Sequence, residues 1–167
     1  MTFKEDIALM IQKQKELDQL ILAKKKLKEY PLDKMNCGLF CELGELLQEV
    51  PAEFKYWKDS AVNNLEKALV EYVDCVHILI SLYIYERKNA WFSLNIPEYN
   101  GVRTDLYYES FTLIQLPNGV SSPCASIETR FAKLWAIGKH LKFTWEQVYD
   151  VYMKKNAVNI ERIERGY

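Results

Sequence analysis

Two pairs of carboxylates share the same short spacing. Glu42 and Glu45 form an ExxE motif, Glu71 and Asp74 form an ExxD motif, and 25 residues lie between the two motifs. Residues three apart on a helix lie on adjacent turns of one face, so each pair could hold one ion. A solvated acidic helix face would explain the first pair equally well.

The second pair stands in a run where solvated acids are not expected. Residues 68–85 read ALVEYVDCVHILISLYIY, and both sides of a helix built from them are largely apolar. Glu71 and Asp74 should therefore be partly buried, and a buried carboxylate must be paired, protonated or bound to a metal. One explanation is an ion pair with a Lys or Arg of another helix. The other is a cluster of all four acids around Mg²⁺, which prefers oxygen ligands and also binds substrate phosphates.

Polar residues also interrupt the apolar face predicted for the first helix. Gln14 and Asp18 stand in the middle of that face. Gln14 could be satisfied by a backbone group. It could also read the edge of a nucleotide base, because an amide both donates and accepts hydrogen bonds.

The last predicted helix and the segment after the first acidic pair add candidate ligand contacts. The inward face of this helix ends in Lys155, Asn156, Asn159 and Arg162. That face would suit a phosphorylated ligand, although a solvated helix end has the same composition. Trp57 is either a core residue or a stacking surface for a planar base.

Helix signals dominate the elements that must position these residues. Thr2-x-x-Glu5 and Thr144-x-x-Gln147 read as capping boxes at two helix starts. We expect helices over residues 2–29, from 33 or 36 to 50, over 62–87, from 126 to between 138 and 142, and over 144–165. Residues 95–123 contain three prolines and two glycines, and we expect a long loop there, with a short hairpin as an option. The fold class is thus all-α: one domain over residues 1–167, a bundle of about five helices.

Composition narrows the function classes. The chain has 167 residues and a net charge of −1, which gives no basic field for nucleic acid. Residues 68–85 are long enough to span a membrane, but each central acid would cost about 2.5–3.5 kcal/mol there, so no span is expected. The start lacks the order of a signal peptide. The four cysteines form no CxxC pair, so we expect reduced, mostly buried thiols, no zinc site and a cytoplasmic protein.

Four stretches of the chain resemble a known family. They are IQKQKELDQLI, CELGELLQEVPAEFKYWK, ALVEYVDCVHILISL and the C-terminal YMKKNAVNIERIERGY. Together they resemble the dimeric all-α dUTPases, which belong to the all-α NTP pyrophosphohydrolase superfamily with the MazG-type enzymes. The ExxE and ExxD motifs alone indicate only the superfamily. The additional blocks are most like the dUTPases of Gram-positive bacteria and their phages.

The resemblance implies an activity and a set of site residues. The reaction would be hydrolysis of dUTP to dUMP and pyrophosphate, with dUDP as a further candidate substrate. Mg²⁺ would be held by Glu42, Glu45, Glu71 and Asp74, with Glu45 as our choice for the residue that activates water. Gln14 and Trp57 would line the uracil pocket, with His77 near the sugar or base. The phosphates and deoxyribose would contact Lys155, Asn156, Asn159 and Arg162. The family works as a homodimer in which the neighbouring subunit helps to close the active site.

Three features depart from the family pattern: Asp18, the proline of QEVPAEF, and the whole 95–123 segment. They affect base specificity more than metal chemistry. One alternative is therefore a pyrophosphohydrolase for dCTP or another nucleotide with the same four acids. A second alternative is a helical interaction protein without activity, although such a protein would have no use for a costly acidic cluster. The 95–123 segment could close over substrate or contact a partner protein.

Overall fold

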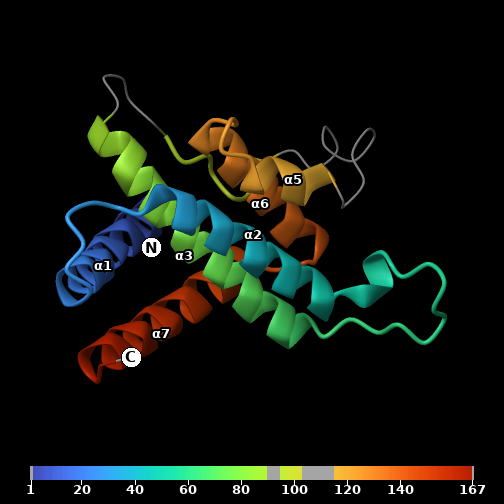
Figure 1. The fold of residues 1–167 in the computed structure, drawn as a ribbon. Coiled ribbons are helices and arrows are strands. Elements are labelled where there is room, and N and C mark those ends of the chain that lie inside the picture. Colours follow the sequence, from blue (N-terminus) through green and yellow to red (C-terminus); the bar gives the residue numbers. More distant parts are fainter. Residues whose placement is uncertain (1, 90–94, 103–114, 167) are drawn as a thin grey trace.

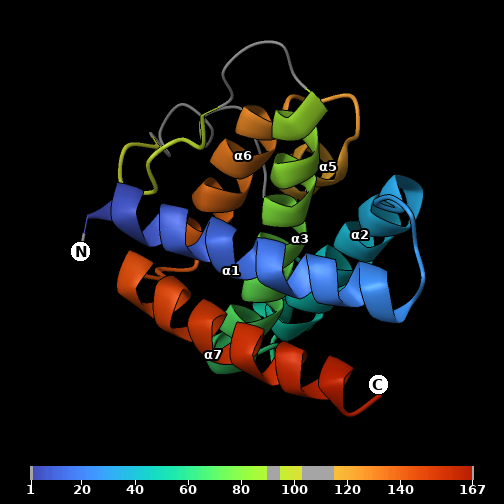
Figure 2. The same cartoon turned by 90° about the vertical axis from the view of Figure 1, so that its left-hand side faces the viewer.

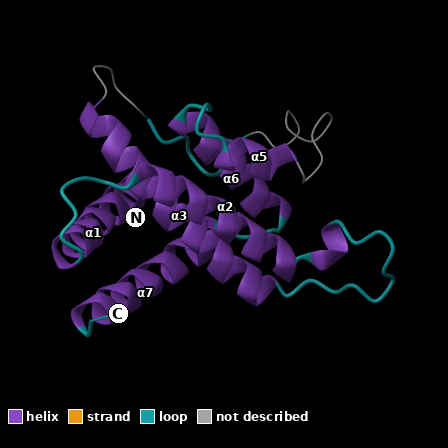
Figure 3. Cartoon of the chain, viewed as in Figure 1, coloured by secondary structure: helices purple, strands orange, loops and turns teal. Residues whose placement is uncertain are grey.

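The computed structural model describes residues 2–89, 95–102 and 115–166, without the side chains of residues 115 and 116. Within these ranges the protein contains six α-helices, one 3-10 helix and no strand (Figures 1 and 3). The helices are α1 (Phe3–Lys24), α2 (Leu32–Glu49), α3 (Leu65–Asn89), α5 (Gln115–Ser121), α6 (Ile127–His140) and α7 (Trp145–Glu164), with the 3-10 helix at Pro51–Glu53. The all-α prediction is confirmed for the described residues.

Helix α3 is the central element of the fold. It packs against α1, α2, α6 and α7, and α1 and α7 run side by side across it (Figure 2). By length and composition α3 could cross a membrane, but 61% of its apolar 18-residue stretch is buried inside the fold. This burial is typical of a core helix, and it forces polar groups on α3 to find partners within the protein.

The predicted helix boundaries are mostly correct to within three residues. Both capping boxes are present, at Thr2 and Thr144. The first helix was expected to reach residue 29 but ends at Lys24, because Lys26 adopts a left-handed conformation with φ of 53°. α3 starts at Leu65, three residues later than expected, and the Asn64 side chain accepts a hydrogen bond from the backbone N–H of Lys67.

The prediction of a long loop over 95–123 is partly wrong, because α5 lies within it. Residues 103–114, where a hairpin was considered, lie outside the described residues. The first part of the segment is anchored to the core. Tyr99 is buried and its hydroxyl donates to the Phe143 carbonyl at 2.8 Å, while Trp135 Nε1 donates to the Pro97 carbonyl at 2.8 Å.

A buried arginine attaches α5 to the rest of the bundle. Arg130, on α6, is 2% exposed. Its Nε donates to the Val120 carbonyl at 2.7 Å, and its Nη2 donates to Asn36 Oδ1 on α2 at 2.9 Å. A short helix that contains proline and glycine has little stability by itself, so this side chain supplies part of what holds it in place.

The cysteines are free, as expected, but the expectation of burial is wrong for three of them. Cys75 is buried in α3, whereas Cys37, Cys41 and Cys124 are exposed. Cys37 and Cys41 stand four residues apart on α2, outside the core stripe of that helix.

Candidate functional site

Three glutamates from two helices form an acidic cluster. Glu42 and Glu45 lie on α2 and Glu71 lies on α3, and one oxygen from each can be chosen so that all three lie within 4.8 Å of one another. The i, i+3 spacing places the two α2 residues on one side of that helix, and α2 packs directly on α3. The predicted association of the two acidic motifs is therefore present for three of the four carboxylates.

Burial and mutual repulsion both disfavour ionisation of two members of this acidic cluster. Burial, together with the charges of Asp74, Glu45 and Glu71, raises the pKa of Glu42 to about 7. Burial and the charge of Asp74 also raise the pKa of Glu71. Clustered carboxylates of this kind are stabilised by a divalent cation, and their all-oxygen donor set fits Mg²⁺.

Asp74 has a cationic partner. Lys155 of α7 places its Nζ 2.5 Å from Asp74 Oδ2, and both side chains are mostly buried. Burial nevertheless raises the pKa of Asp74, against the lowering effect of Lys155. Of the two explanations for buried acids in the 68–85 run, an ion pair thus applies to Asp74 and an acidic cluster applies to Glu71.

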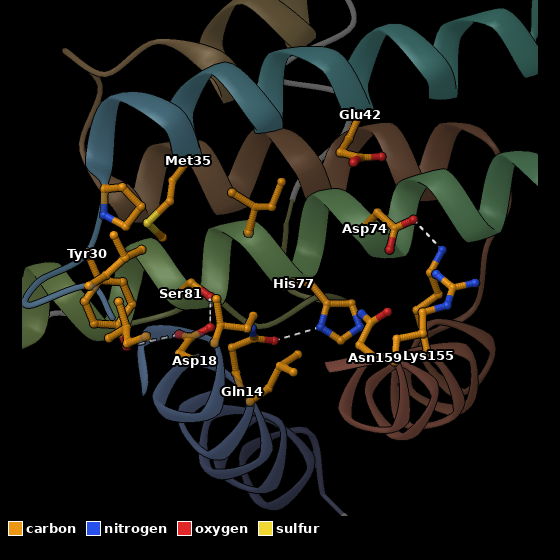
Figure 4. A pocket seen from close by; sticks show the side chains of 17 residues that line it. Gln14, Asp18, Tyr30, Met35, Glu42, Asp74, His77, Ser81, Lys155 and Asn159 are labelled. Atoms are coloured by element: carbon orange, nitrogen blue, oxygen red, sulfur yellow. Dashed lines mark hydrogen bonds and ion pairs between the residues drawn. The ribbon is translucent and has the colours of Figure 1, made fainter. Parts of the chain in front are cut away.

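A pocket of about 400 Å³ extends from the acidic cluster between α1, α2, α3 and α7 (Figure 4). Ten of its lining residues fall into two groups. The first group lies near the cluster and comprises the charged residues Glu42, Asp74, Lys155 and Arg162 together with the amide of Asn159. The second group is uncharged except for one acid and comprises Gln14, Asp18, Tyr30, Met35 and Ser81. His77 lies between the two groups (Figure 4).

Asp18 is the centre of a buried hydrogen-bond network. Its Oδ1 accepts from Ser81 Oγ at 2.8 Å and from Gln14 Nε2 at 2.9 Å, and its Oδ2 accepts from Tyr30 Oη at 3.1 Å. Burial raises the pKa of Asp18 although these three donors lower it. The network joins α1, α3 and the segment after α1 at one end of the pocket.

His77 is enclosed by aromatic and amide groups. Its ring stacks on Tyr152 with 3.9 Å between centroids, and its Nδ1 lies 2.7 Å from Gln14 Oε1. Burial first, and then the charge of Lys155, lower the pKa of His77 to about 3. The imidazole is therefore neutral near pH 7.

The site holds carboxylates that could bind a metal ion, cations that could bind phosphate and a largely uncharged end that could take a nucleoside. These are the groups that a nucleoside polyphosphate requires. A family model described as dUTPase matches residues 6–167. The chain belongs to the dUTPase family. It is therefore an enzyme, a dUTP diphosphatase. No curated protein sequence matches the chain.

This dUTPase brings most of the predicted site residues together. All four acids, Gln14, His77, Lys155, Asn159 and Arg162 lie in the acidic cluster or line the pocket. Asn156 does not line the pocket. It is 2% exposed, and its Nδ2 donates to the Lys13 carbonyl at 3.4 Å, which ties α7 to α1.

Trp57 is also absent from the pocket. Its side chain is 65% exposed and lies with Phe40 and Tyr56 along a separate apolar groove at the ends of α2 and α5. In this structure Trp57 does not line the pocket that holds Gln14 and His77, so its place beside uracil stays a prediction.

Two polar residues of the pocket, Ser81 and Tyr30, were missed from the sequence. Ser81 follows Asp74 by seven residues, two turns along the same face of α3, and this spacing could have indicated it. Tyr30 lies in the connection between α1 and α2 and carried no such signal.

Proposed function

We propose that this dUTPase hydrolyses dUTP to dUMP and pyrophosphate with Mg²⁺ held by Glu42, Glu45, Glu71 and Asp74. The observation that supports the proposal most is the approach of three glutamates from two helices to within 4.8 Å, beside a pocket lined by Lys155. We also propose that the enzyme belongs to the all-α NTP pyrophosphohydrolase superfamily, together with the MazG-type enzymes. Within the dUTPases we propose that it is most like those of Gram-positive bacteria and their phages.

Each part of the pocket has a chemical role in this proposal. Bound Mg²⁺ would neutralise phosphate charge and lower the pKa of coordinated water. Lys155 and Arg162 bind the phosphates, and Asn159 contacts the phosphates or the deoxyribose. Glu45, the exposed member of the acidic cluster, orients the attacking water and accepts its proton.

The uncharged end of the pocket takes the nucleoside. Gln14 and His77 are both buried and bonded to each other, so they offer a rigid edge to the base or sugar. Such preorganised polar groups select a ligand by the bonds that a wrong ligand leaves unmade. dUDP is a candidate second substrate, because it carries the same nucleoside and a cleavable diphosphate.

The deciding experiment compares release of phosphate products from dUTP, dUDP, dCTP, dTTP and UTP, each with Mg²⁺ and with EDTA. We expect fast Mg²⁺-dependent pyrophosphate release from dUTP and little from the other triphosphates. Faster release from dCTP would support the alternative pyrophosphohydrolase on the same acids. Undiminished activity in EDTA would contradict the metal assignment.

We further propose that the enzyme is a homodimer. The apolar groove exposes Phe40, Tyr56 and Trp57, whose side chains are 65%, 93% and 65% exposed. Contiguous exposed aromatic residues are typical of protein interfaces. In the dimer, Trp57 would reach the uracil pocket of the other subunit, which would account for its absence from the pocket of its own chain.

We also place the enzyme in the cytoplasm. Cys37, Cys41 and Cys124 are exposed and free. Exposed thiols remain unpaired most readily in a reducing compartment. Measurement of the free thiols in protein purified without reductant would test their state.

A further inference from the structure

One nitrogen in the pocket lacks a hydrogen-bond partner. His77 is 6% exposed, and its Nε2 is a buried polar atom with no partner among the described residues. A buried polar atom without a partner costs free energy, so such atoms are uncommon and often belong to binding sites. Whether this nitrogen would donate to a ligand or accept from it depends on where the ring carries its proton.

Asp18 determines how the Gln14 amide is oriented. The Asp18 carboxylate already accepts hydrogen bonds from Ser81 at 2.8 Å and from Tyr30 at 3.1 Å. A carboxylate can only accept, so the group that Gln14 presents to it at 2.9 Å must be the NH₂. The amide carbonyl oxygen then has to face the opposite way, toward α3 and α7.

That carbonyl oxygen in turn fixes the proton of His77. Gln14 Oε1 accepts from the Tyr152 hydroxyl at 2.8 Å and lies 2.7 Å from His77 Nδ1. A carbonyl oxygen also only accepts, so Nδ1 must carry the single proton of the neutral ring. The backbone of Tyr152 also acts on the ring and raises the pKa of His77, while Nε2 has no hydrogen-bond partner among the described residues.

We propose that Asp18 is a positioning residue: through Gln14 it holds the His77 proton on Nδ1 and so keeps Nε2 as an acceptor for a donor group of the bound nucleotide. In dUTP this donor is the N3–H of uracil or the 3′-hydroxyl of the sugar. The identity of the ligand rests on the proposed function, whereas the position of the proton does not. Cytosine has an unprotonated N3 and cannot make the first of these bonds.

The position of the proton can be measured directly. The chain contains two histidines, so a His140→Gln background leaves His77 as the only imidazole. ¹⁵N NMR of that protein distinguishes a protonated from an unprotonated ring nitrogen. We expect the Nδ1–H tautomer, and a protein with the proton on Nε2 would overturn the proposal whatever the variants show.

Substitutions separate the carboxylate from its neighbours. In Asp18→Asn the new amide can donate to Gln14, so Gln14 is free to turn its NH₂ toward His77, and we expect the Nε2–H tautomer to appear. Ser81→Ala and Tyr30→Phe each remove one donor but keep the carboxylate, and both should retain Nδ1–H. An unchanged tautomer in folded Asp18→Asn would contradict the proposed effect of Asp18 on His77 through Gln14. If that variant does not fold, Gln14→Met removes the acceptor and should also release the tautomer.

Nucleotide analogues identify the donor. The probes are dUMP, 3-methyl-dUMP and 2′,3′-dideoxyuridine monophosphate, each added to the labelled protein in EDTA. We expect dUMP to shift the Nε2 resonance and one analogue to lose that shift: the methyl analogue for a base contact, the dideoxy analogue for a sugar contact. Equal shifts with all three would overturn the acceptor role. Failure of dUMP to bind, with the Nδ1–H tautomer present, would count against the proposed function instead.

Steady-state kinetics provide a second test of the proposed action of Asp18 on His77 through Gln14. Loss of one hydrogen bond to substrate should raise KM for dUTP about 10-fold in Asp18→Asn, with kcat little changed, since about 1.4 kcal/mol corresponds to a factor of ten. Asp18→Glu keeps a carboxylate and should recover part of the loss. A fall in kcat at constant KM would contradict a role in substrate recognition.

Discussion

Lys155 Nζ lies 2.5 Å from Asp74 Oδ2, and this ion pair joins α7 to α3 at the edge of the acidic cluster. It supplies one positive charge to a region that holds four carboxylates. The same lysine lines the pocket. Lys155 therefore contributes to the stability of the metal-free protein and is also one of the groups proposed to bind phosphate.

The Lys155→Met variant should be less stable without metal. It leaves Asp74 mostly buried and unpaired, and we expect the free energy of unfolding in EDTA to fall by about 1–3 kcal/mol, less than for a fully buried pair. Chemical denaturation measures the loss. Mg²⁺ should restore part of it, and Lys154→Met on the exposed side of α7 is the matched control. An equal loss with and without Mg²⁺ would show that the pair has no relation to metal binding.

The acids of α3 should be required for turnover but not for folding. Glu71→Gln removes a charge from the acidic cluster and Asp74→Asn removes one at its edge, and we expect dUTP hydrolysis to fall at least about 10³-fold in each, since a catalytic metal contributes several kcal/mol. Circular dichroism should show an intact helical fold. Glu66→Gln, an exposed acid on the same helix, serves as the control. Unfolded variants would indicate that these acids are structural.

The metal-free enzyme should lose stability as the pH rises. The pKa of Glu42 is raised from its ordinary value of 4.5 to about 7, so the folded state binds this proton more tightly than the unfolded state. Its contribution to stability is fully present below about pH 4.5 and is lost as the pH rises through about 7. Glu71 shifts in the same direction.

Thermal unfolding in EDTA at pH 5, 6, 7 and 8 measures this dependence. The midpoint should decrease across the series, and Glu42→Gln should flatten the decrease. Mg²⁺ should raise the midpoint most at pH 8, where the carboxylates are ionised and able to bind it. A midpoint that rises with pH in EDTA would contradict the assignment of uncompensated charge to the acidic cluster.

The apolar groove should control assembly. A Phe40→Asp change places a charge in a surface that the proposed dimer buries, and charges are depleted from the centres of interfaces. We expect sedimentation velocity to show a shift from dimer to monomer and activity to fall with it. Val158→Asp, which alters a 43% exposed apolar residue on α7, should leave the assembly unchanged. A wild-type monomer with full activity would contradict the proposed role of Trp57.

The sequence was sufficient to predict the parts of the fold that depend on local patterns. The capping boxes at Thr2 and Thr144 and the apolar periodicity located the long helices. Acids within the apolar run of α3 indicated partly buried charge, and the structure confirms it for Glu71 and Asp74. Each of these signals lies within one or two helical turns.

The features that sequence reasoning missed depend on contacts between distant segments. α5 contains Pro117 and Gly119, and it is held by Arg130, which no local pattern connects to it. Tyr30 reaches Asp18 from a connection between helices. Trp57 follows the ExxE motif by twelve residues in the sequence, yet its side chain lines a different groove. In each case the role of the side chain depends on the segment that it contacts, which lies elsewhere in the sequence.

The central position of α3 has one more consequence. This helix carries Glu71 and Asp74 in the acidic part of the site, His77 in the middle of the pocket and Ser81 at the nucleoside end. At about 1.5 Å of rise per residue, Asp74 and Ser81 are separated by about 10 Å along one rigid axis. The backbone of a single helix thus fixes the distance between the acidic and the nucleoside ends of the site. A one-residue insertion between Asp74 and Ser81 would lengthen this distance and rotate one side chain about 100° relative to the other around the helix axis.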